Sequence, residues 1–373
     1  MSRNATKDLT TGSPMKLILG FGIPLLFGML FQQFYNMMDT IIVGKFLGVS
    51  ALASVGATGS INFMIIGFCM GVCNGFAIPV AQRFGAKDEH GMRKFVANSV
   101  WLSIIFAVVM AVLVCVFCRQ ILELMNTPED IIDGSYSYIF VIFLGIPATY
   151  MYNLLSGIMR SLGDSKTPLY LLIFSSILNI ILDLLSIIVL KMGVAGVAWA
   201  TVLAQAVSGF CCLGVIWKKF PILHVQREEW QPDKLCILNL CNMGIPMGLQ
   251  YSITAIGTMM VQSSLNILGS SAVAAFTAGS KIENIFTQAF VALGTTMSTY
   301  NAQNIGARQL DRVRRGFRAA DVIGCIYAVA VGFILFYAGK YFSYLFISDN
   351  ADVVIPMVDV YLQCVGMFMI PLY

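Results

Sequence analysis

The chain has 373 residues, of which 58% are apolar and only 11% are charged, with a net charge of +4. Soluble globular proteins carry roughly 25% charged residues, and these supply most of the surface that faces water. A soluble multidomain enzyme is therefore excluded, and the composition indicates an integral membrane protein.

Ten apolar runs follow one another along the chain, each long enough to cross a bilayer as a helix of roughly 20 residues. They lie at 15–43, 52–82, 95–117, 131–158, 169–190, 194–217, 238–268, 272–301, 319–338 and 353–373. The polar stretch 1–14 does not precede a short apolar run with a cleavage site, so a removable signal peptide is not indicated. We expect an all-α integral membrane protein.

The basic residues gather on one side of the predicted spans. The N-terminus and alternate loops hold 18 Lys and Arg residues, whereas the opposite side holds Lys45, Arg119, Lys191 and Lys340. Such a bias marks the cytoplasmic side, so we expect a multi-pass protein of the cell (inner) membrane with its N-terminus in the cytoplasm. The basic loops are short and scattered, and they do not indicate nucleic-acid binding.

An internal repeat divides the chain in two. The segment 22–24, Gly-Ile-Pro, recurs at 244–246; the segment 81–87 matches 302–308; and Gly48 matches Gly269. A nearly constant offset predicts two lobes related by a parallel repeat, an arrangement found in transporters. We expect a first lobe at 1–219 with six spans, a cytoplasmic linker at 220–235, and a second lobe at 236–373 with four spans.

By comparison with the first lobe, the second lobe lacks two helices. The sequence therefore predicts ten helices of a twelve-helix design, in a fragment or a truncated product.

Two acids inside predicted spans, Asp39 and Asp183, are functional candidates because a charge in the hydrocarbon region is costly. Counting from the outer helix ends places Asp183, Thr201 and Tyr138 each about 10 Å deep, at 1.5 Å per residue, with Asp39 at a similar depth. Asn179 lies one turn from Asp183 on the same face. These oxygens suit a hard cation, and buried carboxylates can also carry protons, so Na⁺ and H⁺ coupling both stay open.

The first span carries a polar stripe formed by Gln32, Tyr35, Asn36 and Asp39, at positions i, i+3, i+4 and i+7. The stripe indicates either the wall of a wet cavity that binds substrate or polar contacts between packed helices. Pro24 on the same helix is a candidate hinge.

The second half offers fewer candidates. No acid occurs between Gly244 and Leu268, Lys281 and Glu283 are assigned a local structural role, and the role of Asp359 stays open. The ten cysteines are interpreted as small buried apolar residues, and we expect no cofactor and no metal beyond a possible Na⁺. No HExxH motif and no nucleophile with a base is present, so the chain is not expected to be an enzyme.

These features together resemble the multidrug and toxic compound extrusion (MATE) family of antiporters. The resemblance rests on Pro24 followed by Asp39, the loops 82–86 and 303–307, the loop 160–168 and the pair Asn179 and Asp183. It implies two six-helix lobes around a cavity and the export of amphipathic organic cations in exchange for inward Na⁺ or H⁺, with no obligate protein partner. It also implies a cation site at Asp39, Asn179, Asp183 and Thr201, with Tyr138 nearby.

Two alternatives stay open beside drug export. A lipid-linked oligosaccharide flippase of the same broad fold would carry basic residues in its cavity, whereas Lys281 is the only Lys or Arg assigned to the interior of a span. A nonfunctional fragment is the other.

Overall fold

The computed structural model describes residues 6–125, 127–267, 270–344 and 351–372, and this part of the chain is helical without a strand. The expected all-α architecture is confirmed. Of the features predicted above, Gly269 in the repeat lies outside the described residues, as do the last residues of the spans 238–268 and 353–373.

The helices follow the predicted spans in chain order. The first half contains α1 (Pro14–Leu47), α2 (Val49–Ala57), α3 (Gly59–Gly85), α4 (Glu89–Val116), α5 (Cys118–Leu124), α6 (Ile132–Leu144), α7 (Ile146–Ser161), α8 (Lys166–Leu184), the π-turn η1 (Leu185–Val189) and α9 (Gly193–Lys219). After the short 3-10 turns η2 (Pro221–Leu223) and η3 (Arg227–Trp230) come α10 (Lys234–Asn266), α11 (Ser270–Gly306), α12 (Leu310–Ser343), α13 (Ala351–Met367) and α14 (Met369–Leu372).

Within the described residues, six single helices are long and apolar enough to cross a membrane: α1, α3, α4, α8 with η1, α9 and α12. The pair α6 and α7 forms one further, broken span, bent by 46°. The break falls at Gly145, just before Pro147, which has no N–H to donate to the preceding turn. Two other expected spans coincide with the long helices α10 and α11, and the last with the shorter α13.

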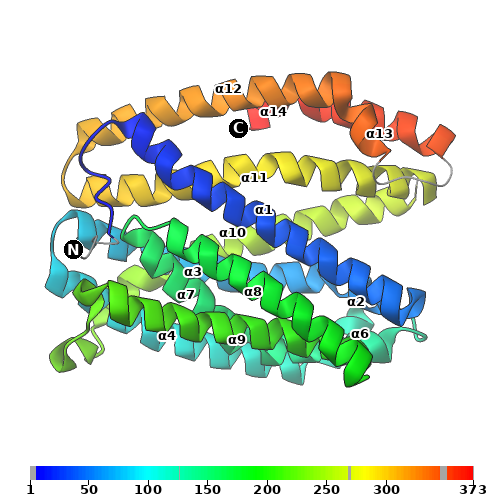
Figure 1. Ribbon diagram of the computed structural model, residues 1–373, viewed down its shortest axis with the longest axis horizontal. Coiled ribbons are helices and arrows are strands. Elements are labelled where there is room, and N and C mark those ends of the chain that lie inside the picture. Colours follow the sequence, from blue (N-terminus) through cyan, green and yellow to red (C-terminus); the bar gives the residue numbers. More distant parts are fainter. Residues whose placement is uncertain (1–5, 126, 268–269, 345–350, 373) are drawn as a thin grey trace.

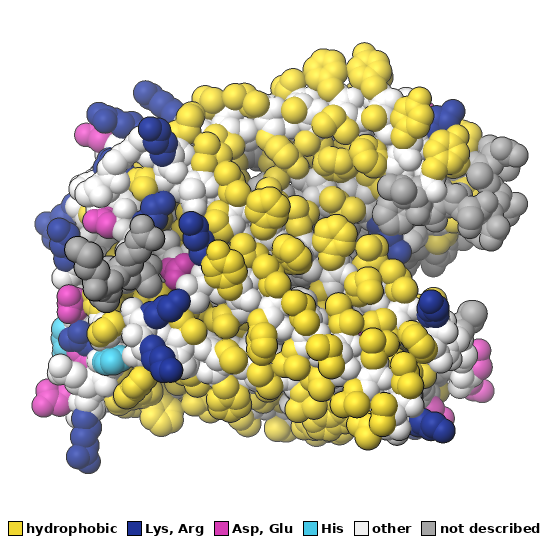
Figure 2. Space-filling model, in the orientation of Figure 1, with side chains coloured by type: hydrophobic (Ala, Val, Ile, Leu, Met, Phe, Trp, Pro, Cys, Tyr) yellow, Lys and Arg dark blue, Asp and Glu magenta, His cyan; other side chains and the backbone are white. Residues whose placement is uncertain are grey.

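Long helices such as α11 and α12 run along the longest axis of the molecule, and α1 crosses the view obliquely to them (Figure 1). Apolar side chains cover the middle of the visible face, and most charged side chains lie at its two ends, with Lys and Arg concentrated at the end that holds the N-terminus (Figure 2). We call this end, with the loops 86–88, 162–165, 220–233 and 307–309, the basic end. An apolar belt between charged ends is what a bilayer requires, so the protein is a multi-pass membrane protein.

The two largest clusters of buried apolar side chains lie within residues 42–240, around Phe76 and Phe143, and within 275–369, around Leu335 and Leu362. Two smaller clusters join α1 and the N-terminal segment to the second half; they consist of Leu9, Ile18, Met297, Tyr300 and Ala320, and of Phe21, Leu25 and Ala292. Close helix crossings add to these contacts between the halves.

Two of these crossings are related by the repeat. On α3, a Cβ added to Gly75 would lie 2.5 Å from the Cα of Gly244 on α10, so these two backbones touch through small residues. Gly22 on α1 is the repeat counterpart of Gly244, and it faces Thr296 on α11, the counterpart of Gly75. A Cβ on Gly22 would lie 3.1 Å from Oγ1 of Thr296. A side chain thus separates α1 from α11, whereas α10 contacts α3 backbone to backbone.

The repeated loops meet each other at the basic end. A Cβ on Gly85 would lie 1.9 Å from the carbonyl oxygen of Gln303, and a Cβ on its counterpart Gly306 would lie 1.8 Å from that of Gln82. The ends of α3 and α11 therefore cross in a reciprocal contact that only glycine permits.

An N-terminal segment also crosses this end of the molecule. The backbone N–H of Lys7 donates to Leu162 (2.9 Å), and that of Leu9 donates to Oε1 of Gln303 (2.9 Å). Arg312 on α12 donates to the carbonyl of Gly12 (2.9 Å). The segment therefore joins the two halves where their helices already touch.

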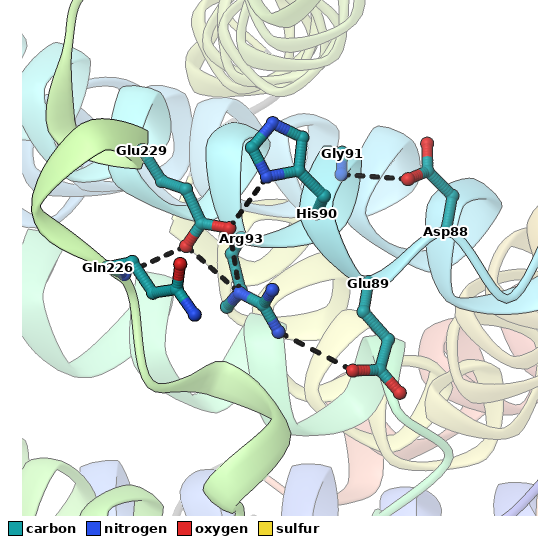
Figure 3. A network of polar contacts seen from close by, with 7 residues as sticks. All are labelled: Asp88, Glu89, His90, Gly91, Arg93, Gln226 and Glu229. Carbon is teal, nitrogen blue, oxygen red and sulfur yellow. Dashed lines mark hydrogen bonds and ion pairs between the residues drawn. The ribbon is translucent and has the colours of Figure 1, made fainter.

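The linker between α9 and α10 is fixed to α4 by a buried ionic network (Figure 3). Glu229, only 1% exposed, accepts from Nε of Arg93 through both oxygens (2.9 Å each) and lies 2.9 Å from Nδ1 of His90. It also accepts from the backbone N–H of Gln226 (2.8 Å).

Candidate functional site

The five residues predicted to bind a cation come together on four helices of the first half. Asp39 lies on α1, Tyr138 on α6, Asn179 and Asp183 on α8, and Thr201 on α9. Asp183 is 0% exposed and Asn179 is 1% exposed, so these two side chains are removed from solvent and from lipid.

Thr201 is at the centre of the hydrogen bonds in this cluster. Its Oγ1 accepts from the hydroxyl of Tyr35 (3.3 Å) and from Nδ2 of Asn179 (3.3 Å), and it donates to the carbonyl of Val197 (3.1 Å). The hydroxyl therefore ties α1 to α8 and α9.

The carboxyl groups of Asp39 and Asp183 are direct neighbours, within reach of a hydrogen bond if one carries a proton, and Tyr138 lies within the field of both charges. Four buried oxygens here lack a hydrogen-bond partner: Oδ1 of Asp39, Oδ1 of Asn179, and Oδ1 and Oδ2 of Asp183. Buried acceptors are normally satisfied. A cation or a proton is the species that such a set of oxygens can take.

The backbone next to Asp183 is irregular. The α-helix ends at Leu184 and continues as the π-turn η1, and the hydroxyl of Ser186 donates to the carbonyl of Asp183 (3.0 Å). π-Turns inside helices occur often at functional sites. The apolar run 169–190 does not predict this turn.

A cavity lies beside the cluster, lined mostly by α1, α3, α7, α8 and α9, with Tyr251 on α10 and Thr295 on α11 also lining it. Pro24, Gln32 and Tyr35 line it, together with Thr149, Asn153, Thr201 and Gln205. Asn36 is exposed and is not among the lining residues, so the structure brings only part of the predicted stripe to the cavity. Pro24 lies within α1, which continues as a helix on both sides of it.

Arg160, at the end of α7, also lines the cavity. The sequence pattern predicts Arg160 in a loop and Lys281 as the only basic residue inside a span. That prediction is wrong, because Lys281 is exposed and Arg160 lies in the cavity. The cavity therefore does contain a basic residue, as a flippase of this fold would be expected to have.

The acids of the second half have local partners. Glu283 on α11 accepts a hydrogen bond from the hydroxyl of Tyr361 on α13. Asp359 accepts one from the side-chain amide nitrogen Nε2 of Gln363 on its own helix (3.1 Å). The described residues show no second cluster of unpartnered acids comparable to that of Asp39 and Asp183.

Comparison with known proteins identifies the family. The family model described as MatE matches residues 24–185 and 246–373. The chain belongs to the MATE family. The match covers most of both halves, and family members are transporters.

Relatives of this MATE protein are named for drug resistance. It is 30% identical over 344 residues to the probable multidrug resistance protein YpnP of Bacillus subtilis, covering 92% of this chain and 76% of that protein. It is 29% identical to the probable multidrug resistance protein YoeA of the same organism, over 88% of this chain and 73% of that protein. A solved structure described as the outward-facing conformation of a multidrug resistance MATE family transporter of the MOP superfamily is 25% identical, with a TM-score of 0.89 over 97% of this chain and 80% of that one.

Proposed function

We propose that this MATE protein exports amphipathic, mostly cationic drugs or toxins from the cytoplasm in exchange for inward Na⁺ or H⁺. The observation that carries the proposal is the set of unpartnered oxygens on Asp39, Asn179 and Asp183, beside a cavity that lies mainly in the first half and also contacts α10 and α11. The family match and the relatives named for multidrug resistance support drug export over the flippase alternative. We place the protein in the cell membrane with the basic end in the cytoplasm.

The coupling works through charge at the Asp39 and Asp183 pair. When both are ionised, two negative charges lie next to Tyr35 and Thr201, which line the cavity, and they attract a cationic group there. Binding of Na⁺ or H⁺ neutralises part of this charge and weakens the hold on the drug. Because Asp39 is on α1 and Asp183 is on α8, the bound cation also joins these helices.

We assign the resulting movement to α1, with Pro24 as its hinge. Pro24 removes one backbone hydrogen bond within the helix, and Thr296 keeps the α1 backbone away from α11. A coupling ion can shift such a helix only if it binds the two positions with different affinities. Closure of the Asp39 site around the ion supplies that difference.

The test is efflux of a fluorescent cationic dye from cells that express the full-length protein. We expect Asp39→Asn and Asp183→Asn each to abolish active efflux, because an amide cannot exchange a proton and binds Na⁺ weakly. Asp133→Asn is the matched control, since Asp133 is an exposed acid at the other end of the molecule from the basic end. Unimpaired efflux by both cluster variants would refute the proposal, and proteoliposomes with an imposed Na⁺ or pH gradient would identify the ion.

A further inference from the structure

Among the residues that the structure describes, Arg160 has no anionic partner. Its guanidinium donates to Oγ of Ser156 (3.3 Å) and to Oδ1 of Asn74 (3.2 Å), both of which are neutral. Among the described residues, no carboxylate lies within ion-pair distance of it. Two of its five N–H groups therefore have partners that carry no charge.

Arg160 is also the only charged side chain among the described residues that line the cavity. Asn74, Tyr152 and Tyr251, which line the same region, contribute polar groups and aromatic faces. The acids Asp39 and Asp183 do not line the cavity and lie beyond Tyr35 and Thr201. Thr149, which lines the cavity near that end, precedes Arg160 on α7 by eleven residues, a rise of roughly 16 Å along the helix.

The cavity is therefore polarised along its length. Its outer end borders the acid cluster, and its inner end, nearest the basic end of the molecule, carries the positive charge of Arg160. A charge that is partly shielded from water without a counter-charge is unfavourable, and the structure retains this one where a ligand can reach it. A guanidinium matches the planar geometry of a carboxylate or phosphate through paired hydrogen bonds.

A purely structural role would be to clamp α7 to α3 through Asn74. The two neutral acceptors require an N–H donor but no positive charge, so the clamp gives no reason for a permanent charge in the cavity. The remaining donors of Arg160 are the part of the side chain that the clamp does not explain.

We propose that Arg160 forms an anion-binding subsite, and that the exported substrates include amphiphiles with a carboxylate or phosphate group, above all zwitterions whose cationic group faces the acid cluster. This inference rests on the proposed export function and names its substrate class. An apolar body between the two charged groups then contacts Leu25, Met29 and Leu172, which line the middle of the cavity.

The test uses two dyes that share one apolar body: a rhodamine with a free benzoate group, which is a zwitterion, and the methyl ester of the same rhodamine, which is a cation. Fluorescence anisotropy measures the binding of each dye to the purified full-length protein. The variants are Arg160→Gln, which removes the charge, Arg160→Lys, which keeps it, and Arg119→Gln, in which an exposed arginine far from the cavity is changed in the same way.

We expect the affinity of Arg160→Gln for the zwitterion, relative to the ester, to fall at least tenfold below that of the wild type. Arg160→Lys should retain most of the wild-type ratio, and Arg119→Gln all of it. An equal loss of affinity for both dyes in Arg160→Gln would show a structural role and overturn the proposal. If this variant does not fold, the two dyes are compared on the wild type alone: a preference for the zwitterion supports the proposal, and equal affinity or a preference for the ester overturns it.

The outcome is independent of the coupling mechanism. Binding to the purified protein requires neither an ion gradient nor transport, so the dye ratio can change in Arg160→Gln even if Asp39→Asn transports normally. In the reverse case, loss of coupling in Asp39→Asn with an unchanged dye ratio in Arg160→Gln would refute the anion subsite and leave the proposed export function intact.

Discussion

A single hydroxyl group organises the candidate cation site. Thr201 accepts from both Tyr35 and Asn179, and this fixes the Asn179 amide, whose oxygen has no partner. Without the hydroxyl, the amide of Asn179 loses its anchor and Tyr35 loses its link to α9.

We therefore predict that Thr201→Val weakens ion coupling while Thr201→Ser preserves it. Each hydrogen bond contributes about 1 kcal/mol, so the Na⁺ or H⁺ concentration that gives half-maximal efflux should rise several-fold in the valine variant. Dye efflux measured against Na⁺ concentration and pH would show the shift. An unchanged concentration dependence in Thr201→Val would contradict this role.

The residues of the cluster were predictable from the sequence because helical depth follows from simple counting. Asp183, Thr201 and Tyr138 were each placed seven residues from a helix end, and the structure brings them together with Asp39 and Asn179. Arg160 was missed because α7 continues past the apolar run that ends at 158. The enrichment of Lys and Arg at the cytoplasmic ends of spans does not distinguish a basic residue that faces the cytoplasm from one that faces a cavity.

At the scale of elements, the linker is attached to the first half by its ionic network. Burial alone raises the pKa of Glu229, but the hydrogen bonds from Gln226, Arg93 and His90 outweigh this effect and hold the pKa below its ordinary value. A lowered carboxylate pKa stabilises the folded state above the ordinary pKa of roughly 4.3. The stabilisation is lost as the pH falls through the lowered value.

We predict that Glu229→Gln destabilises the protein by about 3–5 kcal/mol at neutral pH, since it leaves Arg93 without its buried partner. The difference between the wild type and the variant should shrink as the pH falls below the ordinary glutamate pKa. Thermal unfolding of the purified protein across this pH range measures both effects. Glu123→Gln is the control, because the exposed pair of Glu123 and Arg119 should contribute less than about 1 kcal/mol.

The long helices were predictable from the apolar runs, but their interruptions were not. The run 131–158 gives two helices because Gly145 and Pro147 break it, and the run 169–190 ends in a π-turn. Hydropathy measures the average affinity for lipid over a window, so it does not respond to where one backbone hydrogen bond is lost.

For the whole molecule, the repeat predicted symmetry, and the structure shows where the symmetry is broken. Gly75 and Gly244 let α3 and α10 touch, whereas Thr296 separates α11 from α1. The repeat is also asymmetric in its acidic residues, since Asp39 on α1 has no counterpart on α10. The less tightly packed helix is thus the one that carries the proposed coupling residue.

The reciprocal contact of Gly85 with Gln303 and of Gly306 with Gln82 closes the basic end of the molecule. The proposed export requires this end to open in another conformation. A carbon atom needs roughly 3.5 Å of separation from its neighbours, so a methyl group on Gly85, placed 1.9 Å from the Gln303 oxygen, forces α3 and α11 apart.

We predict that Gly85→Ala and Gly306→Ala shift the population towards conformations in which the basic end is open. Gly294→Ala on α11 is the matched control, because a Cβ there meets nothing within 4 Å. Spin labels at Lys87→Cys and Arg308→Cys, in the two repeated loops, report the separation through pulsed electron-spin distance measurements, with the exposed Cys325 and Cys364 replaced by serine. Both alanine variants should lengthen the distance in the same direction, as the repeat relates the two contacts. An unchanged distance distribution in both folded variants would show that this contact does not control the opening of the basic end.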